Sequence, residues 1–265
     1  MIARFRIDSR NAPTLSFERL EDRTLLSIFT VTNLGDAGSG SLRQAVIDAN
    51  NSSGDDTIVF QSGLNGMIQL TSGEMDVTDN LVVTGLGQTN TVIDAQQNSR
   101  IFDVSGSNTV FTLNSLTLQN GRVNTYSEDG GAIRSTSAGG TLTISGSTLS
   151  SNSIVGSSSL GGAQGGAIYS LSDAVNIINS SLMGNYIGEG IYGGNGKGGA
   201  IYAKNGAVTI AGSTVSGATV PGSSASFGGA VVARYGNVSI SNSTLSGNSS
   251  VDSGGAILAY DGDVT

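Results

Sequence analysis

A block of about 30 residues recurs in the second half of the chain, and this repeat restricts the possible folds more than any other feature. Ile144, Ile177, Ile210 and Ile240 mark the same point in four copies, 33, 33 and 30 residues apart. An aliphatic residue follows each isoleucine five positions later: Leu149, Leu182, Val215 and Leu245. A fixed period of this length is typical of a solenoid, in which each repeat buries its apolar face only against its neighbours.

Within each copy, the pattern predicts short strands separated by tight turns. An apolar-polar-isoleucine stretch points two side chains inward and one outward, and glycine or asparagine stands two positions after the isoleucine. These are the residue types that adopt positive φ most readily, so we expect a left-handed turn there: Gly146, Asn179, Gly212 and Asn242. Asn152, Asn185 and Asn248 are expected to form an internal amide ladder, which Ala218 interrupts.

Composition agrees with many short strands joined by turns. The 265 residues include 40 glycines and 2 prolines, whereas aromatic and charged residues make up only 5% and 12%. A helical or α/β globule would be richer in Leu, Glu, Lys and Ala. The sequence therefore predicts an all-β protein, a right-handed parallel β-helix with one short N-terminal capping helix.

Charge and missing residue types exclude several functions. The net charge is −8 and the only lysines are Lys197 and Lys204, which argues against nucleic acid as a partner. The absence of cysteine and histidine excludes disulfides, the usual zinc sites and serine–histidine catalysis. No stretch reaches the about 18 apolar residues that a membrane-spanning helix requires.

Residues 1–27 are expected to form a leader. They carry five arginines without the apolar core of a secretory signal. Leu20, Glu21, Arg23 and Leu25-Leu26-Ser27 resemble the Leu-Glu-x-Arg-x-Leu-Leu-Ser element at the N-termini of exported planctomycete-type bacterial proteins, with Asp22 where that family most often has proline. The resemblance implies an exported bacterial protein, located outside the cell or at its surface.

Residues 28–60 are expected to form an N-terminal cap with a helix over about 41–50. Ser41 and Gln44 match a capping box, Leu42, Ala45, Val46 and Ala49 fall on one helix face, and Asn50 is expected at the C-cap. The segment Gly40-Ser41-Leu42-Arg43-Gln44-Ala45 resembles the Cys-Ser-Leu-Arg-Glu-Ala core of bacterial surface parallel β-helix proteins.

The β-helix itself is expected over 61–265, with regular repeats from about 128. Gly-Gly-Ala units begin at Gly130, Gly165, Gly198, Gly228 and Gly254, and they resemble the repeats of chlamydial polymorphic outer-membrane proteins. That family pairs Gly-Gly-Ala-Ile with Phe-x-x-Asn, whereas here the aromatic position is aliphatic. Asp263-Val264-Thr265 aligns with the residues just before Ile240, so the last repeat is expected to be truncated, as in a fragment of a longer surface protein.

Carboxylates are the realistic catalytic candidates that remain. Asp94, Arg100 and Asp103 fall on neighbouring predicted strands and are the candidates if the protein is an enzyme. β-Helix lyases and hydrolases that act on acidic polysaccharides use acids and an arginine on such a face. The alternative interpretation, which the repeat favours, is ordinary outward-facing charge.

Two further patterns bear on ligand binding. Acids precede several Gly-Gly-Ala units, at Glu128-Asp129, Glu189 and Asp252, and stacked acids of this kind bind Ca²⁺, although their spacing is irregular and solvated loops fit better. Residues 191–198 are glycine-rich and contain Lys197, but they lack the Gly-Lys-Ser/Thr ending of a phosphate-binding loop. No cofactor is therefore expected.

The sequence favours a non-enzymatic exported protein, structural or adhesin-like, with glycans or other surface proteins as partners. Outward-facing residues of the repeat form a polar column: Thr143, Asn176, Thr209 and Ser239. This column is either a flat binding surface for a glycan or for ice or, as the Ser- and Thr-rich composition favours, ordinary β-sheet surface. The alternative is a β-helix polysaccharide lyase or glycoside hydrolase that acts on acidic glycans.

Overall fold

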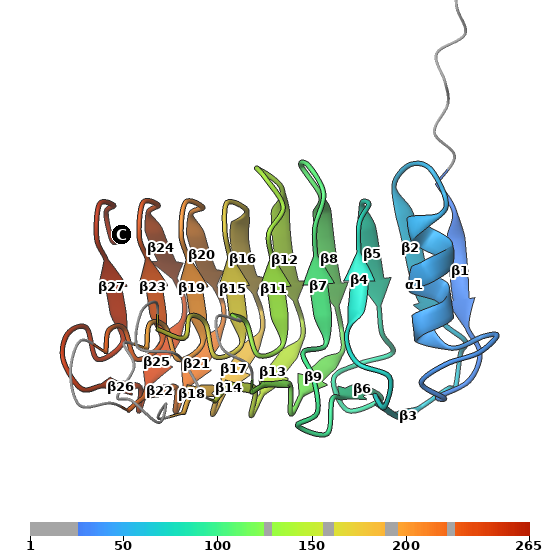
Figure 1. Cartoon of the computed structure of the whole chain (residues 1–265), viewed down its shortest axis with the longest axis horizontal. Coiled ribbons are helices and arrows are strands. Elements are labelled where there is room, and N and C mark those ends of the chain that lie inside the picture. The colour runs from blue at the N-terminus through green and yellow to red at the C-terminus, as the bar shows by residue number, and fades with distance from the viewer. Residues whose placement is uncertain (1–25, 125–128, 156–161, 189–195, 222–225) are drawn as a thin grey trace, which may run out of the picture.

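The computed structural model describes residues 26–124, 129–155, 162–188, 196–221 and 226–265. Its strands stack along one axis, and the single helix lies at the N-terminal end (Figure 1). All strand pairs are parallel, and each pairs with the equivalent strand one coil away. The expected fold class, an all-β parallel β-helix with one short helix, is confirmed.

Each regular coil contributes strands to four sheets in turn, which we call A, B, E and C. Sheet A contains eight strands: β1 (Ile28–Val31), β2 (Asp56–Phe60), β5 (Leu81–Thr84), β8 (Val110–Asn114), β12 (Thr141–Ser145), β16 (Ala174–Ile178), β20 (Val208–Ala211) and β24 (Val238–Ser241). Sheet B contains β3 (Gly66–Gln69), β6 (Thr91–Asp94), β9 (Thr117–Gln119), β13 (Thr148–Ser150), β17 (Ser181–Met183), β21 (Thr214–Ser216) and β25 (Thr244–Ser246).

The other two sheets complete the coil. Sheet E has five short strands, β10 (Arg122–Val123), β14 (Ser153–Ile154), β18 (Tyr186–Ile187), β22 (Thr219–Val220) and β26 (Ser249–Ser250). Sheet C contains β4 (Met75–Val77), β7 (Phe102–Val104), β11 (Ile133–Ser135), β15 (Ile168–Ser170), β19 (Ile201–Ala203), β23 (Val231–Ala233) and β27 (Ile257–Ala259). The chain enters sheet E only from β10 onward, so the earliest coils are simpler.

Helix α1 (Leu42–Asn50) covers the outer edge of sheet C, where β4 has no strand beyond it. Asn50 donates to the Asp76 carbonyl at 2.7 Å and accepts from the Thr78 N–H at 2.9 Å, and Arg43 donates to the carbonyls of Gly73 and Glu74. These side chains satisfy backbone groups that an open sheet edge would leave unpaired. The helix therefore acts as the cap that the sequence predicts.

The details of the helix ends differ from the expectation. Ser41 is the N-cap and its Oγ accepts from the Gln44 N–H, but the Gln44 side chain donates to Asp48 instead of returning to Ser41. The capping box is thus half formed. The C-cap is Asn51, one residue later than expected, because Asn50 is used to bind the edge of sheet C.

Asp36 fastens the loop before α1 to the loop between β3 and β4. Its carboxylate pairs with Arg43 at 2.8 Å and accepts from the backbone N–H groups of Thr71 and Ser72. Burial by itself acts to raise the pKa of Asp36, but these hydrogen bonds outweigh it and lower the pKa to about 2. The cap is therefore joined to the first coils by an ionised carboxylate.

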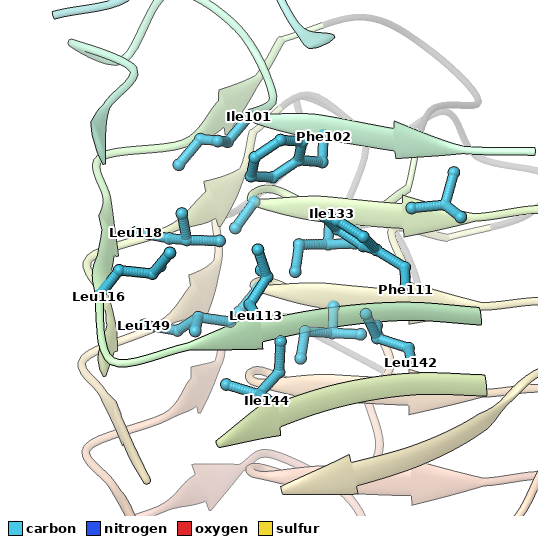
Figure 2. Close-up of a cluster of buried hydrophobic side chains, with 14 of the residues drawn as sticks. Ile101, Phe102, Phe111, Leu113, Leu116, Leu118, Ile133, Leu142, Ile144 and Leu149 are labelled. Atoms are coloured by element: carbon cyan, nitrogen blue, oxygen red, sulfur yellow. The ribbon is translucent and has the colours of Figure 1, made fainter. Parts of the chain in front are cut away.

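The core consists of stacked apolar columns, part of which Figure 2 shows. Leu113, Ile144, Ile177, Ile210 and Ile240 lie in register on sheet A. Leu118, Leu149, Leu182, Val215 and Leu245 do the same on sheet B. Both predicted columns are confirmed, and they continue toward the N-terminus through Val83 and Ile58 on sheet A and through Ile93 and Ile68 on sheet B.

The turn between sheets A and B is left-handed, as predicted. Gly146, Asn179, Gly212 and Asn242 have φ of 53°, 49°, 58° and 49°. The serine after each of them forms a ladder that the sequence did not reveal. Ser147 Oγ accepts from Leu116 N–H, Ser180 Oγ accepts from Ser147 N–H, and the pattern continues through Ser213 and Ser243.

The asparagine ladder is present, but it binds mainly backbone. Asn185 Oδ1 accepts from the Asn152 N–H at 3.0 Å, and Asn185 Nδ2 donates to the Leu149 carbonyl at 3.0 Å. Asn152 and Asn248 make the same pair of bonds to the coils before them. Ala218 interrupts the ladder as predicted, since no side chain from position 218 reaches the Asn185 N–H.

Each residue of the Gly-Gly-Ala unit has its own structural reason. The first glycine has positive φ, from 61° to 72° across the five copies. At the second glycine of the first four copies, a Cβ would lie too close to a neighbouring backbone oxygen, for example 2.1 Å from Gly199 O at Gly166. The alanine is fully buried in four copies: Ala132, Ala167, Ala200 and Ala230. The repeat signature is thus accounted for by the corner of the coil.

The division of the chain into leader, cap and β-helix stays a prediction. The leader expected over 1–27 lies outside the described residues apart from Leu26 and Ser27. The boundary expected at residue 60 coincides with no break in sheet A, because β1 and β2 are already its first two strands. Within the described ranges, no helix is long and apolar enough to cross a membrane.

Candidate functional site

Charged side chains gather on the outer face of sheet C near its N-terminal end. The register places Asp76, Asp103 and Arg134 side by side on β4, β7 and β11. Arg134 donates two hydrogen bonds to the Asp103 carboxylate, from Nε and Nη2, and both are 2.8 Å long. Two parallel hydrogen bonds between a guanidinium and a carboxylate form a strong ion pair with a defined geometry. The carboxylate oxygens of Asp103 are therefore occupied by Arg134.

Arg100, just before β7, is 3% exposed and lies next to this column. Its Nη1 donates to Glu74, and Nε and Nη2 donate to the carbonyls of Asp129 and Gly130. A buried cation needs such partners to offset its desolvation. Arg100 therefore joins the loop before β4 to the first Gly-Gly-Ala corner.

A cleft of about 390 Å³ opens beside Arg100. Its lining includes Glu74, Arg100, Arg122 and Asn124. Arg122 bonds to Asn124 at 2.7 Å and to Gln97 at 3.1 Å. Two arginines and one carboxylate give the cleft a net positive charge, which suits an acidic ligand better than a basic one.

Asp94 does not belong to this group. It ends β6 on sheet B, whereas Arg100 and Asp103 belong to the sheet C side of the coil. Its carboxylate accepts from the Gln96 N–H and from the side-chain amides of Gln119 and Asn120. Asp94 therefore lies on a different sheet from Asp103, because consecutive strands of a coil enter different sheets.

The acids that precede the Gly-Gly-Ala units, which are the candidates for binding Ca²⁺, lie partly outside the described residues. Glu128 and Glu189 lie outside the described residues, Asp252 is exposed, and Asp129 accepts from the Gln164 N–H. A different group of acids, Glu74, Asp76 and Asp103, has oxygens within 4.8 Å of one another. Arg100 and Arg134 already neutralise two of these three carboxylates, so the group is an ion-pair network.

The central outward column of sheet A is polar and uncharged from β8 to β24, although Val110 and Ile178 are also exposed on this face. Thr112, Thr143, Asn176, Thr209 and Ser239 lie in register on consecutive strands. Stacked strands are spaced by about 4.8 Å. The predicted polar column is thus confirmed, with Thr112 as a further member.

The outer column of sheet C changes character along the β-helix, which sequence analysis did not anticipate. After Asp76, Asp103 and Arg134, the register continues through Tyr169, Tyr202, Val232 and Leu258. The rings of Tyr169 and Tyr202 stack with centroids 5.8 Å apart and planes 4° from parallel. The signal was the residue after each Gly-Gly-Ala-Ile, which reads Arg, Tyr, Tyr in successive copies.

Neither the models of known protein families nor the curated protein sequences match this chain.

Proposed function

We propose that this chain is an exported, non-catalytic β-helix that acts outside the cell or at its surface as a structural or adhesin-like element. The proposal rests on the hydrogen-bond partners of the candidate acids, each of which is bound by another side chain. Asp94 is held by amides, Asp103 by Arg134 and Glu74 by Arg100. General acid–base catalysis requires carboxyl groups that can exchange protons with a substrate, and salt-bridged or amide-bound carboxylates are poorly suited to this.

The uncharged column on sheet A supports the same proposal. It presents hydroxyl and amide groups at a regular spacing on a face built from rigid strands. Such a face suits extended polar polymers, because repeated hydrogen-bonding groups meet a repeated set of partners. Glycans of a cell envelope or matrix are partners of this kind.

A second candidate is a lyase or hydrolase acting on acidic glycans. The cleft beside Arg100 favours it, because Glu74 and two arginines line a cavity large enough for a sugar unit. In that case Glu74 is the acid to test, since Asp94 lies on another sheet.

Turnover of uronic-acid polymers separates the two candidates. The full chain is incubated with pectic and alginate-type polymers, and reducing ends and the absorbance of unsaturated products are followed, with co-sedimentation on insoluble polysaccharide in parallel. We expect retention on polysaccharide without any product. Product formation that Glu74→Gln abolishes in a normally folded protein would replace the proposal by the enzymatic alternative.

The location is tested separately. The protein is expressed in a bacterium with and without residues 1–27, and the cells are fractionated. Only the form that carries residues 1–27 should be found outside the cytoplasm. Equal cytoplasmic retention of both forms would contradict the export part of the proposal.

A further inference from the structure

A pocket of about 270 Å³ lies on the sheet C side of the last coils, well away along the axis from the charged N-terminal patch. Tyr202 on β19, Arg234 and Tyr235 after β23, and Tyr260 after β27 line it, together with Lys197 and Asp261. Backbone hydrogen bonds place the residues after β23 and β27 on adjacent coils: Tyr260 N–H donates to Ala233 O, and Asp261 N–H donates to Arg234 O. Hydrogen bonds between adjacent coils therefore fix the positions of the residues that line the pocket.

The aromatic residues give the pocket two kinds of surface. Tyr235 and Tyr260 are 49% and 46% exposed, whereas Tyr202 is 1% exposed and lies at the bottom. Phe227 supports Tyr260 in an edge-to-face contact, with ring centroids 6.1 Å apart. Tyrosine combines a flat apolar ring with a hydroxyl group, which is why it is common in binding surfaces.

Two cations converge on the same cavity. The Arg234 guanidinium carbon lies 5.0 Å from the centre of the Tyr235 ring, an arrangement typical of a cation–π contact. Burial lowers the pKa of Lys197, and the positive charge of Arg234 adds to this effect, while Asp129 opposes it. Among the described residues, neither Lys197 nor Arg234 has a carboxylate within ion-pair distance.

The positive charges at this pocket are not balanced by acids in the way that they are elsewhere on sheet C. Elsewhere in the described chain, the arginines that line sheet C are each paired with an acid: Arg43 with Asp36, Arg100 with Glu74 and Arg134 with Asp103. At the aromatic pocket, the two cations repel each other and the only acid in the lining is Asp261. An anionic ligand would remove that repulsion.

We propose that the pocket formed by Tyr202, Tyr235 and Tyr260 binds one anionic sugar residue of a glycan, with its ring against the tyrosines and its acidic group between Lys197 and Arg234. The inference rests on the proposed function, which it deepens by giving the ligand class and the site. Pockets that bind drug-sized ligands have volumes of about 300–1,000 Å³. The volume of this pocket lies just below that range, so it fits a single sugar ring.

The chemistry favours a sugar over a free small anion. The C–H groups on one face of a pyranose pack against a tyrosine ring, and its hydroxyl groups bond to phenol and carboxylate oxygens such as that of Asp261. A guanidinium binds a carboxylate or a sulfate group in a planar, two-point manner. Uronic acids and sulfated sugars share this combination of ring and anion.

The test is isothermal titration calorimetry of the full chain with three trisaccharides: an oligogalacturonate, the neutral oligogalactoside and a sulfated oligogalactoside. We expect the two anionic ligands to bind at least 10-fold more tightly than the neutral one, with an affinity that falls as salt is raised. The stronger of the two identifies the acidic group.

Variants assign the binding to this pocket. Arg234→Gln and Tyr235→Ala should each weaken binding at least 10-fold, whereas Arg122→Gln, which removes the same charge from the other cleft, should leave it unchanged. Far-UV circular dichroism and the unfolding midpoint check that the exposed substitutions leave the fold intact. Lys197→Met provides a second removal of charge if Arg234→Gln alters folding.

Each outcome supports or overturns a distinct statement. Equal binding of neutral and anionic sugars, or loss of binding in Arg122→Gln alone, overturns the inference. Absence of binding to all three ligands also overturns it, while retention on insoluble polysaccharide would leave the proposed function standing. Cleavage of any ligand overturns the proposed function itself.

Discussion

Replacing Ala218 by asparagine should stabilise the protein, because it restores the missing member of an internal ladder. Ala218 is fully buried and lies in the column of Asn152, Asn185 and Asn248. In the intact steps, an asparagine accepts from the backbone N–H of the equivalent residue one coil earlier and donates to a carbonyl three residues before that one. At position 218 the partners would be the Asn185 N–H and the Leu182 carbonyl.

The size of the effect follows from these two bonds. Each hydrogen bond contributes about 1 kcal/mol net, and ordering the side chain costs about 1 kcal/mol. The two bonds together exceed this cost by about 1 kcal/mol, so we expect Ala218→Asn to raise the free energy of unfolding by about 1 kcal/mol.

Guanidinium denaturation followed by circular dichroism measures the effect, and a higher midpoint with an unchanged slope indicates greater stability. Hydrogen exchange of the peptide that contains Asn185 reports the new bond locally, and it should slow. Ala218→Val is the control: it adds volume without any hydrogen-bonding group and should not protect Asn185. Asn185→Ala removes an intact step and should destabilise by about 2 kcal/mol.

The reasoning would be refuted if Ala218→Asn lowered the midpoint or left exchange at Asn185 unchanged. Destabilisation by about 1–3 kcal/mol would mean that the site is too tightly packed to admit the amide.

Three further predictions concern the cap, the corner and the first turn. The pKa of Asp36 is about 2 in the folded protein, against an ordinary value of 3.8. The ionised carboxylate therefore contributes about 2 kcal/mol to the free energy of unfolding above pH 4, and this contribution is lost as the pH falls toward 2. Asp36→Asn should remove this part of the pH dependence from an acid-unfolding curve. Gly166→Ala should destabilise by more than about 3 kcal/mol, because its Cβ would lie 2.1 Å from Gly199 O, whereas Gly184→Ala, with positive φ but open space, should cost only about 1 kcal/mol in the same denaturation assay. Ser115 has a φ of 55° at the position that is glycine or asparagine in later coils, a backbone conformation that is strained for serine. Ser115→Gly should therefore raise the free energy of unfolding by up to about 1 kcal/mol and increase the denaturation midpoint. A lower midpoint would contradict the strain at Ser115.

The repeat allowed much of the fold to be predicted because a solenoid makes its contacts between equivalent positions. Ile144 and Ile177 could be placed in one column from their spacing alone, and Asn152 and Asn185 in one ladder. The glycines of the corner were predicted to allow a sharp turn or a close backbone approach, and the structure assigns these two roles to the first and second glycine separately.

The candidate sites could not be predicted equally well, because they depend on which sheet a residue enters. Asp94 and Asp103 are nine residues apart in sequence, yet one ends a strand of sheet B and the other lies on sheet C. Conversely, Glu74 and Arg100 come from different coils and meet in one ion pair. No local pattern distinguishes these cases.

The amino-acid sequence by itself determined the period, the inward columns, the turn residues and the break at Ala218, because each is a property of positions that repeat along the chain. Only the tertiary structure decided what gathers on the outer faces. Register brings Asp103 next to Arg134, and stacking of adjacent coils brings Lys197, Arg234 and Tyr260 around one pocket. The physical reason is that outward side chains are constrained by their neighbours one coil away, about 30 residues distant in sequence, while the core is constrained by the repeat itself.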